Sequence, residues 1–350
     1  MFLIAGVLQI LFGCIEKSEP VDTQAATGLE TGQETGQETG VVGQVGSLRF
    51  IVLGDAGANP LISEVEGETT ELHFQSAIAA AIGTVCQDKG CDFALYLGDN
   101  FYESGVESVD DPQFVGKFEE PFGALGIPFY AVLGNHDYGE PMSPPVWERP
   151  EPQIEYSGVS EIWKMPDRYY TFQYEHTRFF ALDTTMVVSN HVWCAGEVPC
   201  YAEEQEQWLN DALTTSEAGW NIAFGHHTLR SNGSHGNAGE YENIRDPELL
   251  TAGVHVLEFF ENTVCGKADL YMSGHDHNLQ WVGPYCGTEI IVSGAASKLR
   301  LLQDRQNDTL FEYEAERGFA WFEIVDDTLF GAFYDVHANL LYEHSITKTW

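Results

Sequence analysis

The chain has 350 residues, which is enough for one large domain or two small ones with a substantial buried core. Acidic residues outnumber basic residues 54 to 16, so the formal net charge is −38. A surface this negative repels nucleic acid and anionic membranes, and a DNA- or RNA-binding function is therefore disfavoured. Solubility is the simplest explanation of the charge.

The N-terminal segment has the pattern of an export signal. Residues 2–12 are apolar apart from Gln9, and Gly13 and Cys14 follow, as at a lipoprotein-type cleavage site. The apolar run is too short to span a bilayer, and no Lys or Arg precedes it, unlike in most export signals. We expect residues 1–14 to be a leader and the protein to be extracytoplasmic, either tethered to a membrane by lipid on Cys14 or released from a plainly cleaved signal.

Residues 15–46 are poor in large apolar side chains and contain the repeat ETGQETGQETG. Such a segment cannot form a core, so we expect a flexible tether that leads into a folded domain of residues 47–350.

Six cysteines remain after Cys14 and fall into near neighbours: Cys86 with Cys91, Cys194 with Cys200, and Cys265 with Cys286. An even number in an exported chain favours disulfides. Six cysteines allow fifteen pairings, so near-neighbour pairing is a hypothesis. A thiolate metal site is disfavoured because no CxxC spacing occurs.

Five short apolar segments each end in Gly followed by Asp, Asn or His, as expected of strands buried on both faces. They are LRFIVLGD (48–55), FALYLGD (93–99), PFYAVLGNHD (128–137), NIAFGHH (221–227) and ADLYMSGHDH (268–277). Helical periodicity lies between them, with one-sided apolar sets at Phe74, Ile78, Ile82 and Val85, at Trp208, Leu209, Ala212 and Leu213, and at Leu250, Val254 and Leu257. This alternation predicts an α/β domain whose ligands gather at the carboxyl ends of the strands.

The pattern changes after Cys286. GTEIIVSGA and GFAWFEIVDDTLFGAFYDVHANLLYEHSI predict antiparallel hairpins, with turns at residues 326–327 and 338–339. A second sheet packed on the first would explain them. The stretch 139–167, rich in Pro and without periodicity, is expected to be a long surface excursion beside the site.

Asp, Asn, His and Tyr side chains follow these strand ends. Mixed oxygen and imidazole ligands suit iron, zinc or manganese, and a carboxylate can bridge two ions. Two ions about 3.5 Å apart can clamp a phosphoryl group during an in-line displacement. The pattern therefore predicts a phosphoester hydrolase.

Five motifs in order resemble the signature of the purple acid phosphatases, and the single-domain tartrate-resistant type looks most similar. The motifs are DAG (55–57), GDNFY (98–102), GNHD (134–137), GHH (225–227) and GHDH (274–277). Longer segments such as QIEYSGVSEIWKMPDRYY, ALDT and IIVSGA extend the resemblance from about Leu48 to the end. The resemblance implies a catalytic domain (47–350) of two packed mixed β-sheets flanked by helices, a four-layer α/β/β/α sandwich.

Tyr102 separates this family from other binuclear phosphoesterases. Their first motif is Asp-x-His, with a histidine ligand, whereas Gly57 stands at that place here. Tyr102, three residues after Asp99, is placed to supply the missing ligand as a phenolate, a hard anion that favours Fe(III).

The resemblance also implies the remaining roles. Fe(III) would be held by Asp55, Asp99, Tyr102 and His277, and Asp99 would bridge to a divalent Fe, Zn or Mn held by Asn135, His226 and His275. His136 and His235 match residues that contact phosphate and protonate the leaving oxygen. Asp276 and Asn278 are expected to orient neighbouring ligands, although turn formation would also explain Asp276. His227 is assigned to the rim.

The expected activity is hydrolysis of phosphate monoesters, carried by small molecules or phosphoproteins, at a binuclear Fe(III)–M(II) centre. Because Fe(III) is a strong Lewis acid, an acidic pH optimum is expected. Two alternatives remain open: a phosphodiesterase or nucleotide hydrolase on the same scaffold, and a surface phosphate-binding protein without catalysis.

Overall fold

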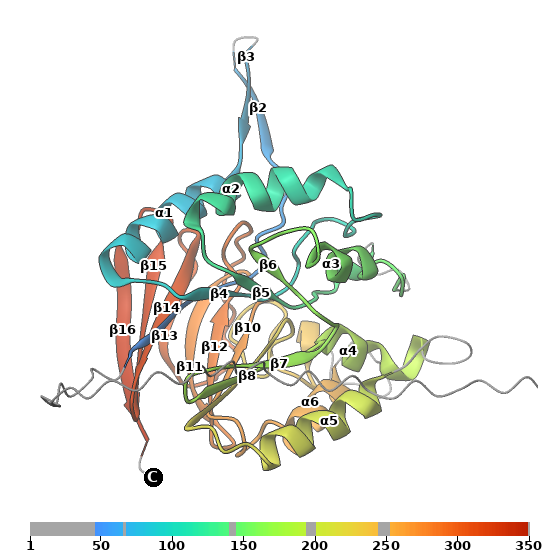
Figure 1. Ribbon diagram of the computed structural model, residues 1–350, viewed down its shortest axis with the longest axis vertical. Coiled ribbons are helices and arrows are strands. Elements are labelled where there is room, and N and C mark those ends of the chain that lie inside the picture. The colour runs from blue at the N-terminus through green and yellow to red at the C-terminus, as the bar shows by residue number, and fades with distance from the viewer. Residues whose placement is uncertain (1–45, 66–67, 140–144, 194–200, 244–252, 349–350) are drawn as a thin grey trace, which may run out of the picture. The chain divides into compact units, whose positions relative to one another are not determined.

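Two mixed sheets of seven strands each form the centre of the fold (Figure 1). The first has the order β16 (Leu340–Thr347), β15 (Thr328–Asp335), β14 (Gly318–Val325), β1 (Leu48–Leu53), β4 (Phe93–Tyr96), β5 (Phe129–Ala131) and β6 (Trp163–Lys164). The second has the order β13 (Thr309–Tyr313), β11 (Leu279–Tyr285), β12 (Thr288–Ser293), β10 (Leu270–Ser273), β9 (Trp220–Gly225), β8 (Thr177–Ala181) and β7 (Tyr170–Tyr174). Within the first sheet β1, β4, β5 and β6 are parallel, and within the second β8, β9, β10 and β12 are parallel.

The computed structural model describes residues 46–65, 68–139, 145–193, 201–243 and 253–348. The predicted leader, the predicted tether up to residue 45, Leu250 and the pair Cys194 and Cys200 lie outside these residues. Within the described ranges, none of the helices combines the length and apolar character that a membrane crossing requires.

Aromatic side chains pack the two sheets against each other. Phe50 on β1 stacks on Phe93 and meets Phe179 of the second sheet edge-on, with ring centroids 5.4 Å apart in both pairs. Trp281 on β11 reaches Phe322 of β14 at 5.9 Å. All five side chains are fully buried, so this aromatic layer contributes strongly to hydrophobic stabilisation.

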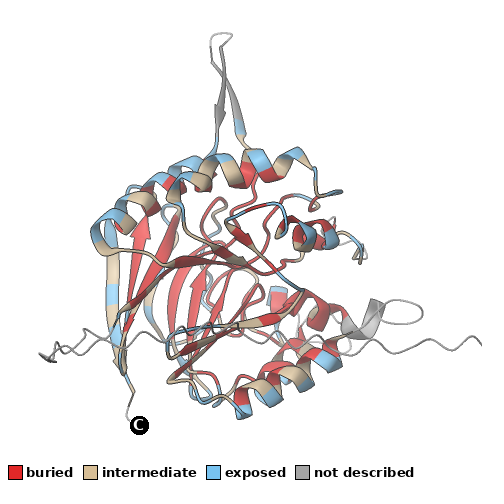
Figure 2. Cartoon of the chain, viewed as in Figure 1, coloured by how far each residue is buried: buried red, intermediate tan, exposed pale blue. Residues whose placement is uncertain are grey.

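Helices cover the outer faces, and Figure 2 shows their outward sides exposed while the central strands are buried. The helix α1 (Phe74–Lys89) and the short α2 (Glu120–Phe122) lie on the first sheet, and α1 buries Ile78, Ile82 and Val85. On the second sheet lie α4 (Thr184–Trp193), α5 (Ala202–Thr214) and α6 (Val254–Asn262). The four-layer α/β/β/α arrangement that the sequence predicts is confirmed.

All five predicted strands form, as β1, β4, β5, β9 and β10, but they are divided between the sheets. The C-terminal strands and the predicted turns also form, but they are divided between the sheets: GTEIIVSGA forms β12 of the second sheet, whereas β14 pairs antiparallel with β1, so that β14, β15 and β16 extend the first sheet. The prediction was therefore wrong for the last three strands, because local patterns define strands and turns, whereas pairing partners are distant in sequence.

The stretch 139–167 is more than a surface excursion. It contains α3 (Glu151–Tyr156) and β6, and it buries Trp163 and Met165 completely. An additional hairpin of β2 (Leu61–Val65) and β3 (Glu68–Leu72) projects beyond α2 (Figure 1).

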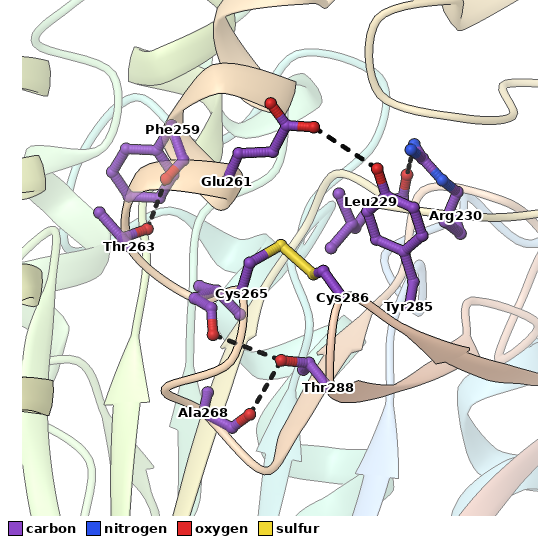
Figure 3. The surroundings of a disulfide bond; sticks show 11 residues. Leu229, Arg230, Phe259, Glu261, Thr263, Cys265, Ala268, Tyr285, Cys286 and Thr288 are labelled. Carbon is purple, nitrogen blue, oxygen red and sulfur yellow. Dashed lines mark hydrogen bonds between the residues drawn. A yellow bond between two sulfur atoms is a disulfide. The ribbon is translucent and has the colours of Figure 1, made fainter.

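Two of the three hypothesised disulfides are present. Cys86 pairs with Cys91 at the end of α1, and Cys265 pairs with Cys286. Figure 3 shows the second bond between the turn after α6 and the β11–β12 hairpin, where Thr288 also donates to the carbonyl of Ala268 at 2.9 Å. The bond therefore fastens the start of β10 to its neighbour β12.

Candidate metal centre

The carboxyl ends of the motif strands from both sheets meet at one place. The Gly54 amide after β1 donates to the Ser293 carbonyl at the end of β12, at 2.8 Å. The His275 amide after β10 donates to the Asp55 carboxylate at 2.9 Å. The sheets therefore bring together side chains that are more than 200 residues apart.

Three of the predicted ligand positions have left-handed backbone conformations: φ is 58° at Asp55, 51° at Asp99 and 66° at His275. Non-glycine residues adopt this region at a cost of order 1–3 kcal/mol, and such residues concentrate at functional sites. Here the sharp turn after each strand brings the side chains of Asp55 and Asp99 together with His226 at the carboxyl ends of the strands.

Gly57 has no room for a side chain. A Cβ atom there would lie 2.3 Å from the Asn100 carbonyl oxygen. The Gly57 amide donates to the Asp99 carbonyl at 3.2 Å, and the Tyr102 amide donates to the Gly57 carbonyl at 3.0 Å. The close packing of these two loops excludes a histidine at Gly57 and places Tyr102 beside Asp55.

One group of donors surrounds the Asp55 carboxylate. The Tyr102 hydroxyl donates to Asp55 Oδ1 at 2.9 Å, and His277 Nε2 lies 3.3 Å from both the hydroxyl and Oδ1. Tyr102 is 2 % exposed and His277 4 %. Three of the residues predicted to hold Fe(III) thus converge.

A second group surrounds His226 Nε2. Asn135 Oδ1 and His275 Nδ1 each lie 3.1 Å from it, and Asp99 Oδ1 lies 3.4 Å away. His226 Nδ1 lies 2.8 Å from the Leu97 carbonyl, which can only accept, so Nδ1 carries the proton. When His226 is neutral, the lone pair of Nε2 faces two acceptor oxygens, Asn135 Oδ1 and Asp99 Oδ1, an arrangement that fits a shared cation.

Asp99 lies between the two groups. Asp55, Asp99 and His226 offer ligand atoms within 4.8 Å of one another, and all three side chains are buried. The mixture of carboxylate, phenol, amide and imidazole donors fits first-row metal ions. The seven residues predicted from sequence are brought together, and they would hold two ions with Asp99 shared.

Burial and neighbouring charges set the protonation of these groups. Burial opposes ionisation of Asp99, but His226 and His136 hold its pKa below the ordinary value. Burial, followed by the influence of the neighbouring His235 and His227 side chains, lowers the pKa of His275 well below its ordinary value. Both groups are thereby kept in the deprotonated form that metal binding requires. Burial, reinforced by Asp55 and Asp99, raises the pKa of Tyr102, so only a strong cation would ionise it.

The two predicted catalytic histidines flank the cluster on different sides. His136 Nδ1 donates to the Glu103 carbonyl at 2.6 Å, which leaves Nε2 directed toward Asp99, 3.9 Å away. The His235 ring stacks on the His275 ring at 4.1 Å, and its Nδ1 contacts the Glu242 carboxylate.

Supporting residues were partly missed from sequence. Asp137 is fully buried and accepts hydrogen bonds from the amides of Asn100 and Gly134 and from the Gln153 side chain at 2.9 Å. Burial and the Asp99 charge raise the pKa of Asp137 to about 7. This carboxyl joins the loops after β4 and β5. The GNHD motif marks Asp137 in the sequence, whereas no motif or periodicity marks Gln153.

Asp276 and His227 also have roles that differ from expectation. Asp276 accepts from the amides of His235 at 2.7 Å and Gly236 at 3.0 Å, so it holds the His235 loop rather than a ligand ring. His227 is buried, not on the rim, and its Nδ1 lies 2.9 Å from the Thr184 hydroxyl.

Two stacked sheets that gather such donors at their strand ends define a binuclear metallophosphoesterase. The model of the calcineurin-like phosphoesterase family matches residues 48–279. Tartrate-resistant acid phosphatase type 5 of Mus musculus is 32% identical over 269 residues, covering 72% of this chain and 73% of the relative. Purple acid phosphatase 4 of Arabidopsis thaliana is 29% identical, covering 87% and 84%. The chain belongs to the calcineurin-like phosphoesterases, among the purple and tartrate-resistant acid phosphatases, and is a hydrolase of that type.

Solved structures support the fold alone. GAP50, the anchor in the inner membrane complex of Plasmodium, superposes with a TM-score of 0.65 at 21% identity, covering 87% of this chain and 90% of that one. A dimetal phosphatase from Danio rerio gives 0.51 at 15% identity, covering 86% and 99%.

Proposed function

We propose that the chain hydrolyses phosphate monoesters at acidic pH, with Fe(III) and a divalent ion held by the seven residues of the cluster. The observation that carries the proposal is the position of the Asp99 carboxylate, whose ligand atom lies within 4.8 Å of those of both Asp55, in the first donor group, and His226, in the second. When bound, two such ions would act as Lewis acids on the phosphoryl group and lower the pKa of water.

The protein groups have distinct tasks in this proposal. Tyr102 supplies the hard anionic oxygen that selects Fe(III), because Gly57 leaves no room for a histidine. His136 presents Nε2 beside Asp99 and would contact the phosphate. His235, held by Glu242 and the Asp276 carboxylate, would donate the proton that the departing alcohol needs.

The test is the visible spectrum of the purified protein together with metal analysis. We expect a purple or pink tyrosinate-to-iron band that disappears in Tyr102→Phe. Tyr170→Phe is the matched control, because the buried Tyr170 hydroxyl donates to the Ala131 carbonyl at 2.9 Å, outside the cluster. A colourless, iron-free protein that hydrolyses aryl phosphates would refute the Fe(III) assignment. An activity maximum well above neutrality at full metal occupancy would refute the acidic optimum.

Export is part of the proposal. Two disulfides support an oxidising compartment, where such bonds persist. Membrane attachment through Cys14 predicts that the protein sediments with membranes and that Cys14→Ser releases it. Equal release of both forms would refute the anchor.

A further inference from the structure

The loop after β12 carries two cationic side chains to the site. The Arg300 amide donates to the His277 carbonyl at 2.9 Å, which fixes the loop beneath a predicted ligand. Lys298 Nζ lies 3.5 Å from the centre of the Tyr102 ring. The whole chain has only 16 Lys and Arg residues against 54 acidic ones. Two basic residues in one short loop beside the site therefore contrast with the acidic composition of the chain.

Lys298 is held by an ion pair that solvent reaches. Its Nζ lies 3.3 Å from each carboxylate oxygen of Glu103, and the side chains are 28% and 49% exposed. An exposed pair of this kind contributes little to stability, because water and salt screen it. Lys298 can therefore leave Glu103 and bind another anion at a small cost in free energy.

Arg300 contacts His235. Its Nη1 lies 3.0 Å from His235 Nε2, and a guanidinium can only donate, so Nε2 accepts in this contact. His235 Nδ1 then carries the proton that binds Glu242. The contact with Arg300 must open before Nε2 can hold the proton that the proposed function assigns to His235. The bond to His235 uses one of the five N–H groups of Arg300. Because Arg300 is exposed, its other N–H groups are available for a ligand.

We propose that Lys298 and Arg300 form a cationic subsite that binds a second anionic group of the substrate, beyond the phosphoryl group that is hydrolysed. This inference rests on the proposed function and narrows its substrate class to phosphate esters with a further carboxylate or phosphate. Lys298 contacts Tyr102 and Arg300 contacts His235, so the two cations lie beside two different members of the site. Elsewhere the strongly negative chain repels such substrates, which makes a local pair of cations the natural recognition element.

The test compares three substrates: phenyl phosphate, 4-carboxyphenyl phosphate, which adds a carboxylate, and 1,4-phenylene bisphosphate, which adds a phosphate. For each protein, kcat/KM of the second and third substrates is divided by that of phenyl phosphate. We expect these ratios to fall about three- to tenfold in the double variant Lys298→Gln/Arg300→Gln, as the loss of two exposed charge pairs predicts. A fall confined to one substrate identifies the anion as carboxylate or phosphate.

The ratio is the decisive readout, because Arg300→Gln also touches His235 and changes turnover of all three substrates together. Lys267→Gln is the matched control: Lys267 precedes β10, at the end of that strand away from the site, and its ratios should equal those of the wild type. Should the double variant melt early, the single variant Lys298→Gln carries the same test with a smaller fall.

Unchanged ratios in a folded double variant that still hydrolyses phenyl phosphate would overturn the subsite and leave the proposed function standing. If the metal-loaded wild type hydrolyses none of the three substrates, the proposed function fails, and the subsite fails with it.

Discussion

The floor and the rim of the site are built in different ways. The floor consists of the seven predicted ligands, and Asp55, Asp99 and His226 within it are at most 1% exposed. The rim consists of His235, Glu242, Lys298 and Arg300, of which Glu242 and Arg300 are exposed. Backbone turns and burial fix the floor, whereas the rim side chains are held by pairwise charged contacts, on loops that are anchored through the His235 and Arg300 amides. Substitutions in the floor should therefore nearly abolish activity, whereas substitutions in the rim should lower it by smaller steps.

The two regions also shift carboxyl pKa values in opposite directions. Beneath the floor, burial and then Asp99 raise the pKa of Asp137 to about 7. On the rim, the hydrogen bond from His235 lowers the pKa of Glu242 despite partial burial. Burial dominates where water is excluded, and specific partners dominate where it is not.

The largest effect is expected from Asp99→Asn. Removing the charge shared by both donor groups should lower kcat by about a thousandfold or more, because several kcal/mol of transition-state stabilisation depends on both ions. Bound metal, measured by elemental analysis, should fall in parallel, and dialysis of the wild type against a chelator should reproduce the loss. Asp92→Asn is the control at the opposite end of β4, where Asp92 accepts from the Arg49 amide. Full activity and two bound ions in Asp99→Asn would contradict the shared role.

The next largest effect is expected from His235→Ala. Loss of a proton donor should lower kcat by about 10² to 10⁴ for an alkyl phosphate. The fall should be smaller for 4-nitrophenyl phosphate, whose leaving group departs without a proton. Metal content should be unchanged, which separates this rim residue from the floor. His344→Ala, on the outer strand β16, should behave like the wild type, and equal falls on both substrates would contradict a proton-donor role.

The residues of the floor could be predicted from the sequence because the features that mark each of them lie close together in the chain. A buried strand, a glycine and a ligand lie within a few residues, so Asp55, Asp99 and His226 could be placed without knowing the sheets. The division of these strands between two sheets was not readable, because pairing such as that of β1 with β14 joins segments far apart in sequence.

The rim and its supports depend on long-range contacts between single side chains. Lys298 meets Glu103 across 195 residues, and Arg300 meets His235 across 65. Gln153, which holds Asn100 at 3.0 Å, lies in a segment without periodicity. No local pattern marks such residues, because their role arises only when the two sheets close on each other.

The smallest of these effects is expected from Glu242→Gln, which keeps the shape of the side chain and removes its charge. The amide can still accept from His235, so kcat should fall only about three- to tenfold. The pH dependence of kcat distinguishes this variant from the wild type better than the size of the fall does. Because the folded pKa of Glu242 lies below the ordinary value of 4.5, its contact with His235 is complete above 4.5 and is lost as the pH falls through the lowered value.

Wild-type kcat should therefore decline at the acid end, and Glu242→Gln should lack that limb because its contact with His235 does not titrate. The measurement is a profile of kcat from about pH 3 to about pH 7, which spans the range of ordinary carboxyl pKa values. Glu107→Gln removes an exposed carboxylate that pairs with Arg149 and not with a site histidine, so its acid limb should match the wild type. If both variants keep the wild-type limb, Glu242 does not orient His235, and the rim is held by its backbone just as the floor is.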